Sequence, residues 1–254
     1  MHILWSIMTK FSNRITNSSK NSSIILANDY NNKIPKLESK TIQNIKSLHE
    51  YICGLKINFH LLLKLGKKEI VKINKTAHDY GLQTIADIKL NDIGNTNLVT
   101  AENLWELGFD ALIVNPIMGN QSLKNLIQNS HRMDKGVISL CHMSAPEARS
   151  SYELNIIKQK NSKKIPLYHI FLEWAIKNKS DGIIVGATYP DIIQFCKQKV
   201  GKKMKIYSPG IGTQGGNPSV AKKLGSDFLI VGRTILNAKN PTRIAKKLAA
   251  DSIL

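Results

Sequence analysis

Three charged residues lie within six positions of one another in the stretch "IADIKLNDIGNTN", which spans residues 85–97. The run Gln83–Lys89 has the apolar character of a buried strand, so Asp87 and Lys89, two residues apart, are expected on the same side of it. An exposed ion pair of this kind contributes little to stability. The alternative is that these two residues and Asp92 form a charged cluster at the mouth of a functional site.

Two further charged residues follow other predicted strands. Asp29 comes directly after the run Ile24–Asn28, and Lys56 lies near the end of the run Tyr51–Ile57. Any one of these residues alone is more often part of a structural ion pair. With the three residues above they make five alternating charges, which are costly to desolvate unless they pair with one another. Such an array is typical of a catalytic site.

Two glycine-containing segments near the end of the chain indicate an anion site. In "YSPGIGTQGGN" the glycines allow backbone N–H groups to approach a ligand, and a helix is predicted to begin after Asn217. In "IVGRTIL", Arg233 follows the last predicted strand. Glycines more often simply make turns. Two such loops next to each other nevertheless favour phosphate binding, with Gln214 and Arg233 as side-chain donors.

The segment "CHMSAPEA" contains a further candidate, Ser144. Its hydroxyl could equally cap a turn or a helix. Cys141 and His142 are not expected to form a nucleophile pair, because consecutive residues of a strand face opposite sides.

These residues fall on a regular alternation of strands and helices. Each predicted strand is a short, unbroken apolar run, as expected of a strand that is buried on both faces. The predicted strands are Ile24–Asn28, Tyr51–Ile57, Gln83–Lys89, Ala111–Val114, Gly136–Leu140, Gly182–Val185, Lys205–Tyr207 and Phe228–Val231. The predicted helices are Leu37–His49, Lys67–Tyr80, Leu98–Leu107, Ser122–Arg132, Ile165–Asn178, Tyr189–Lys199, Pro218–Leu224 and Pro241–Ala250.

This alternation predicts a single (β/α)8 TIM barrel, an α/β fold in which the active site lies at the carboxyl ends of the strands. An open, doubly wound sheet is the alternative. That fold usually carries a glycine-rich phosphate loop after its first strand, and none is present here. The barrel is predicted to occupy residues 23–254, after a mobile polar tail over residues 1–22. Met8 could be an alternative start.

Composition excludes several classes of protein. Hydrophobic residues make up 42% of the 254 residues, which is enough for a core. The apolar runs are too short for a membrane span, and "MHILWSIM" is too short for a secretory signal. Three widely spaced cysteines predict a reducing cytoplasm, with no disulfide framework or zinc site.

The net charge raises the possibility of a nucleic-acid-binding protein. Lysine and arginine number 36 against 18 aspartates and glutamates, which gives a formal net charge of +18. The lysines are scattered over predicted helices, however, and aromatic residues are only 6% of the chain. Single-stranded nucleic acids are bound by clustered cations interleaved with aromatic side chains. No specific nucleic-acid partner is therefore expected.

From Ile24 to Leu248 the sequence resembles orotidine 5′-phosphate decarboxylase, in its short monofunctional archaeal and microbial form. Six segments in order carry the resemblance: "ILANDY", "LKIN", the D-x-K-x-x-D motif in "ADIKLNDI", "MSAPEA", "SPGIGTQGG" and "IVGRTI". The resemblance implies a homodimer that converts orotidine 5′-monophosphate to UMP and CO2 in de novo pyrimidine synthesis, without metal or organic cofactor.

The resemblance also implies roles for individual residues. Lys89 would be the proton donor in a catalytic array completed by Asp87, Lys56 and, from the partner subunit, Asp92. Asp29 and the partner's Thr96 would contact the ribose. The pyrimidine and phosphate would be bound by Ser144, Met143, Ile93, Ile211, Pro209, Gln214, Gly232 and Arg233.

A magnesium-dependent group that resembles 3-keto-gulonate-6-phosphate decarboxylase and hexulose-phosphate synthase shares the D-x-K-x-x-D motif and is the nearest alternative. Those proteins carry an acidic residue near the end of the second strand to help hold Mg²⁺. Here that position is Lys56, whose cation would repel the metal. The Met-Ser segment also favours the pyrimidine enzyme.

Overall fold

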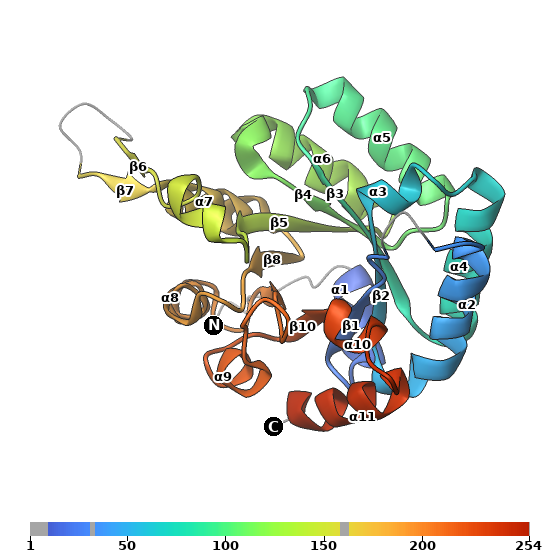
Figure 1. Ribbon diagram of the computed structural model, residues 1–254. Helices are drawn as coiled ribbons and strands as arrows, with labels where there is room; N and C mark the ends of the chain where they lie inside the picture. Colours follow the sequence, from blue (N-terminus) through green and yellow to red (C-terminus); the bar gives the residue numbers. More distant parts are fainter. Residues whose placement is uncertain (1–9, 31–33, 158–162, 254) are drawn as a thin grey trace, which may run out of the picture.

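Eight parallel strands form a closed barrel in the computed structural model, which describes residues 10–30, 34–157 and 163–253 (Figure 1). Around the barrel the order is β1-β10-β9-β8-β5-β4-β3-β2. The strands are β1 Ile24–Ala27, β2 Gly54–Asn58, β3 Gln83–Leu90, β4 Ala111–Val114, β5 Gly136–His142, β8 Gly182–Val185, β9 Lys205–Pro209 and β10 Phe228–Val231. The predicted TIM barrel is confirmed.

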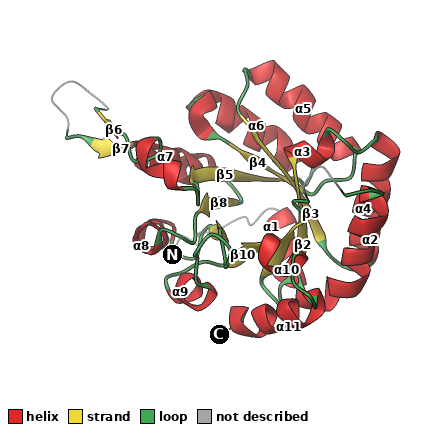
Figure 2. Cartoon of the chain, viewed as in Figure 1, coloured by secondary structure: helices red, strands yellow, loops and turns green. Residues whose placement is uncertain are grey.

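Helices surround the strands on the outside of the barrel (Figure 2). One of these helices follows each barrel strand in the sequence: α2 Leu37–Leu48, α4 Lys67–Asp79, α5 Gly94–Glu106, α6 Asn120–Arg132, α7 Leu167–Asn178, α8 Pro190–Val200, α9 Pro218–Lys223 and α11 Pro241–Ser252. The predicted helix start after Asn217 is confirmed, since its side chain accepts a hydrogen bond from the third residue of α9 at 3.0 Å. Asn240 caps α11 in the same way, also at 3.0 Å. No helix among the described residues is long and apolar enough to cross a membrane.

Several short elements were absent from the sequence-based prediction. They are the helices α3 Phe59–Leu62 and α10 Arg233–Leu236, the 3-10 turns η1 His49–Tyr51, η2 Pro116–Met118 and η3 Pro146–Ser150, and the hairpin strands β6 Asn155–Ile156 and β7 Ile165–Pro166. Segments of two to five residues are too short to show a helical or strand period. Both α3 and α10 begin directly after a barrel strand, so they shape the rim where the site is expected.

The predicted mobile tail over residues 1–22 was wrong for the part that the structure describes. Helix α1 spans Lys10–Ser18, and its Phe11 and Ile15 are both fully buried. These two side chains lie four residues apart and therefore on one face of the helix. A single pair of apolar residues in a polar segment was too weak a signal to predict a helix. Residues 1–9, including Met8, lie outside the described residues.

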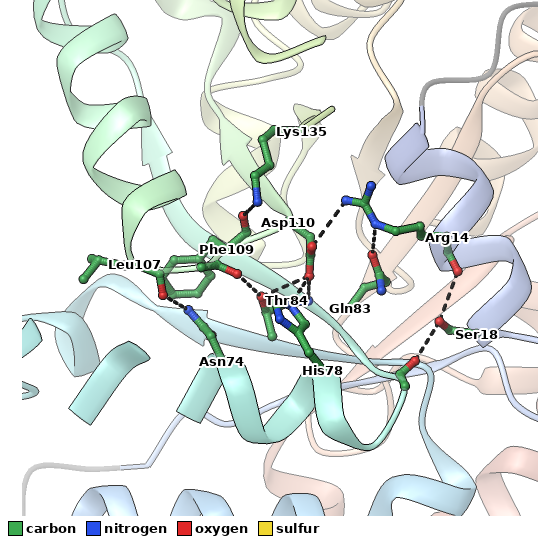
Figure 3. Close-up of polar contacts among 12 residues, drawn as sticks. Arg14, Ser18, Asn74, His78, Gln83, Thr84, Leu107, Phe109, Asp110 and Lys135 are labelled. Atoms are coloured by element: carbon green, nitrogen blue, oxygen red, sulfur yellow. Dashed lines mark hydrogen bonds and ion pairs between the residues drawn. The ribbon is translucent and has the colours of Figure 1, made fainter. Parts of the chain in front are cut away.

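Helix α1 closes the amino-terminal end of the barrel, opposite the predicted site. A Cβ atom on Gly136, at the start of β5, would overlap the Phe11 ring, so this glycine makes room for the helix. Figure 3 shows the polar contacts on this side, where Arg14 donates to Gln83 at 2.8 Å and to Asp110 at 3.3 Å. The helix is thus part of the barrel core and is tied to the starts of β3 and β5.

We expect Phe11→Ala to lower the free energy of unfolding by about 3–5 kcal/mol, because it leaves a cavity under the barrel. Turnover per folded molecule should be unchanged, since Phe11 lies at the end opposite the site. Urea denaturation measures the first quantity and a steady-state assay the second. Asn13→Ala, on the exposed face of the same helix, is the matched control. Equal stability of the two variants would contradict a core role for α1.

Candidate active site

A cavity of about 320 Å³ lies at the carboxyl ends of the barrel strands. Every one of the eight strands contributes a lining residue, and the apolar floor is formed by Ile113, Leu140, Ile184 and Ile230. Charged side chains line one side and the glycine-containing loops line another. The cavity therefore brings together the two groups of residues that the sequence singled out from distant segments.

Four of the five predicted charged residues form one connected array. The Lys56 ammonium donates to both carboxylate oxygens of Asp29 at 3.1 Å and to Oδ2 of Asp87 at 2.7 Å. Lys89 donates to the other oxygen of Asp87 at 2.7 Å. The charges alternate along the chain of contacts, so each buried charge has an opposite neighbour, which offsets the cost of removing it from water.

The array keeps its members charged. Burial alone would raise the pKa of the Asp87 carboxyl, but the ammonium groups of Lys56 and Lys89 lower it to about 2. Burial would likewise lower the pKa of Lys56, yet attraction by Asp87 and Asp29 raises that pKa above its ordinary value. Asp87 is therefore a carboxylate at neutral pH, and it lines the cavity. The Lys89 side chain is 40% exposed and lines the cavity beside it.

The backbone at Lys89 is irregular. Its φ is 47°, in the left-handed region, and the pairing of β3 with β4 shifts register between Asp87 and Leu90. The left-handed conformation costs a residue with a side chain about 1–2 kcal/mol. The predicted contact between Asp87 and Lys89 is confirmed, but a bulge rather than regular strand alternation aims the lysine. Strained backbone of this kind is often found at functional sites.

Asp92, Ile93 and Thr96 do not line this cavity. The Asp92 carboxylate accepts a hydrogen bond from the Ile93 N–H at 2.6 Å, and Asp92 and Thr96 are exposed. Ile93 is 71% exposed and lies outside the cavity of its own chain, so its contact with a pyrimidine stays a prediction. The buried Asn97 fixes this segment, because its side chain bonds both the N–H and the carbonyl of Asp92. Asn97 was not among the residues predicted from the sequence.

The Met143–Ser144 segment lines the cavity as predicted. Its backbone is held closely, because a Cβ atom on Gly186 would lie 2.5 Å from the Ser144 Cα. The Thr188 hydroxyl also donates to the Ser144 carbonyl at 2.9 Å. Among the described residues the Ser144 hydroxyl has no hydrogen-bond partner. A fixed backbone with a free hydroxyl is suited to reading a polar group on a ligand.

Pro209 at the end of β9 lines the cavity, and the loop after this strand adds Ile211 and Gln214. Gly232 after β10 and Arg233, the first residue of α10, line it beside them. The shape of the first loop needs its glycines, since Gly210 and Gly212 have φ of 95° and 73°. The sequence predicted that backbone N–H groups here would bind an anion. The amides at positions 212, 213, 215 and 216 are not available, because they donate to other atoms of the two loops. Among the described residues, the donors without a partner here are the Gln214 and Arg233 side chains and the backbone N–H groups of Gln214, Gly232 and Arg233.

Comparison with known proteins gives one consistent family. A sequence model of "Orotidine 5'-phosphate decarboxylase / HUMPS family" matches residues 22–248. An orotidine 5′-phosphate decarboxylase of Pyrococcus furiosus is 33% identical over 209 residues, which are 82% of this chain and 90% of that protein.

Solved structures that resemble this chain belong to the same family. The orotidine 5′-phosphate decarboxylase from Pyrococcus horikoshii OT3 superposes with a TM-score of 0.74 at 31% identity, over 91% of this chain and 99% of that chain. The orotidine 5′-monophosphate decarboxylase from Methanocaldococcus jannaschii, solved with the inhibitor BMP, gives a TM-score of 0.76 at 26% identity. That match covers 91% of this chain and 98% of the other.

Proposed function

The chain belongs to the orotidine 5′-phosphate decarboxylase / HUMPS family, and we propose that it is a carbon–carbon lyase that decarboxylates orotidine 5′-monophosphate to UMP and CO2 in de novo pyrimidine synthesis. The observation that carries this choice within the family is the position of Lys56. Its ammonium bridges the Asp29 and Asp87 carboxylates. The oxygens that could otherwise bind a divalent cation are thus already neutralised by an amine.

A magnesium-dependent reaction fits this array poorly. Mg²⁺ requires oxygen ligands at about 2.0–2.1 Å. It would have to displace a Lys56 side chain that is 4% exposed and in contact with both carboxylates. The displaced cation would then remain buried beside the metal. We therefore propose that the reaction needs no metal or organic cofactor.

Asp87 and Lys89 supply the chemistry in this proposal. The substrate carboxylate at C6 lies against the Asp87 carboxylate, and this repulsion is relieved as the C6–carboxylate bond breaks and CO2 leaves. The electron pair that remains on C6 is stabilised by the Lys89 ammonium. Lys89 then transfers a proton from Nζ to C6, which yields UMP, and regains a proton from water. Support comes from the 2.7 Å contact of Lys89 with Asp87 and from its exposure to the cavity.

The rest of the substrate is positioned by the remaining lining residues. Asp29 contacts ribose hydroxyls, Ser144 hydrogen-bonds the pyrimidine, and Met143 and Ile211 pack against the ring. Gln214 and Arg233 bind the phosphate together with the backbone N–H of Gly232, while Pro209 shapes the wall of the cavity beside them. Binding energy from the phosphate, remote from the reacting carbon, can then be used to hold the carboxylate against Asp87.

The site is completed across a homodimer. Asp92 and Thr96 are exposed and lie outside the cavity of their own chain. A two-fold axis would carry them to the partner's cavity, where Asp92 extends the charge array and Thr96 contacts the ribose. Cytoplasmic localisation belongs to the same proposal. The three cysteines, Cys53, Cys141 and Cys196, are all buried free thiols, as suits a reducing compartment.

Purified protein should convert orotidine 5′-monophosphate to UMP at the same rate in excess EDTA as in added Mg²⁺, because Lys56 takes the place of a metal. Loss of orotidine-monophosphate absorbance measures the rate, and chromatography identifies UMP. Activity only with Mg²⁺ would favour a sugar-phosphate reaction of the family. The matched trial with 3-keto-gulonate-6-phosphate in Mg²⁺ should give no product.

A further inference from the structure

A second cavity, of about 540 Å³, adjoins the reaction cavity on its phosphate side. Ser144, Ala145, Gln214 and Arg233 line both cavities. The two proposed phosphate ligands, Gln214 and Arg233, therefore stand at the boundary between the cavities. A phosphate bound to these two residues would have the nucleoside on the side of the reaction cavity and the second cavity on its other side.

The second cavity contains its own cation, Arg149, which belongs to η3. Its guanidinium lies over the Tyr189 ring, 5.9 Å from the centroid. Tyr189 is fixed in turn, because its hydroxyl donates to the Ala145 carbonyl at 2.9 Å. Arg149 is exposed to solvent, and its contact with the Tyr189 ring favours positions of the guanidinium that face this cavity.

Neither arginine is neutralised. Across the described ranges, no carboxylate forms an ion pair with Arg149 or Arg233, whereas Arg14 does pair with Asp110. Of the three hydroxyls that line this cavity, those of Thr188 and Tyr189 donate to backbone carbonyls, and that of Ser144 is assigned to the pyrimidine. The donors left for a second phosphate are two guanidinium groups and the Gln214 amide. Two unpaired guanidiniums facing one space favour an anion with several oxygens, such as a phosphate.

We propose that this cavity binds the second phosphate of a pyrimidine nucleoside 5′-diphosphate. The inference rests on the proposed function, which places the nucleoside and first phosphate of UMP in the reaction cavity. A second phosphate joined to the first cannot point back toward the pyrimidine, so it enters the space beyond Gln214 and Arg233. There Arg149 binds it, with Arg233 shared between the two phosphates. UDP is then a tight competitive inhibitor of the decarboxylase.

The test compares UMP and UDP binding to the full chain by calorimetry in EDTA at low ionic strength. Wild-type protein should bind UDP about tenfold or more tightly than UMP, the usual effect of one added charge-assisted contact. Arg149→Ala should remove this advantage and change UMP affinity less than about twofold. Arg149→Lys should retain part of it, because lysine keeps the charge but not the paired donors. Arg132→Ala, an exposed arginine at the end of α6, is the matched control and should change neither affinity.

The outcomes separate the two proposals. If wild-type protein neither turns over orotidine 5′-monophosphate nor binds UMP, the proposed function fails. If UMP binds but UDP binds more weakly, or if Arg149→Ala weakens both ligands equally, only the second-phosphate site fails. Inorganic phosphate titrated into UMP-saturated protein gives a further check. Arg149-dependent binding as tight as that of UDP would show a site for free anions rather than for a diphosphate.

Discussion

Replacing Lys89 with alanine should reduce kcat/KM for orotidine 5′-monophosphate by about 10⁴-fold or more, because the change removes both the proton donor and the cation beside C6. UMP should still bind, since its phosphate and pyrimidine contacts lie elsewhere in the cavity. The fold should also persist. Asp87 keeps its 2.7 Å contact with Lys56, and alanine meets the same backbone cost at φ 47° as lysine does.

Single-turnover kinetics measure the loss, and calorimetry with UMP shows whether the cavity is intact. Lys89→Gly is a useful companion variant. It should be equally inactive and slightly more stable than Lys89→Ala, because glycine adopts the left-handed region without strain. A Lys89→Ala enzyme within tenfold of wild-type turnover would overturn the assignment of Lys89 as proton donor.

Asp92→Asn should also be nearly inactive, although Asp92 lies outside the cavity of its own chain. Asparagine can still accept the hydrogen bond from the Ile93 N–H, so the local turn is retained while the charge is lost. The expected loss comes from the partner subunit, whose Lys89 and Asp87 would no longer face a second carboxylate. Sedimentation should show that the variant remains a dimer.

Mixing this variant with Lys89→Ala tests the shared site directly. The two inactive proteins are unfolded and refolded together. In a mixed dimer one site has both defects and the other has neither, so random pairing should restore roughly a quarter of wild-type activity. Wild-type protein refolded alone gives the reference. A mixture as inactive as its parents, beside an active reference, would place the function of Asp92 within its own chain.

The sequence alone was sufficient for the barrel and for most of the charged site. Unbroken apolar runs such as Ala111–Val114 and Phe228–Val231 predicted strands with the bounds that the structure shows. Parallel strands in a closed barrel all end at the same rim, so residues after these runs must meet there. Asp29, Lys56, Asp87 and Lys89 could therefore be placed together before any coordinates, since local pattern and topology were the only information needed.

Only the tertiary structure decided the details that depend on contacts between distant segments. The bulge at Lys89 follows from the pairing of β3 with β4. The backbone N–H of Thr213, in the loop after β9, donates to the hydroxyl of Thr234, which follows β10. Phe11 becomes a core residue because Gly136 leaves space for it. Arg149 becomes part of a cavity because Tyr189, forty residues later, contacts it there. In each case a side chain's role is set by a neighbour far away in sequence, and no local periodicity encodes that neighbour.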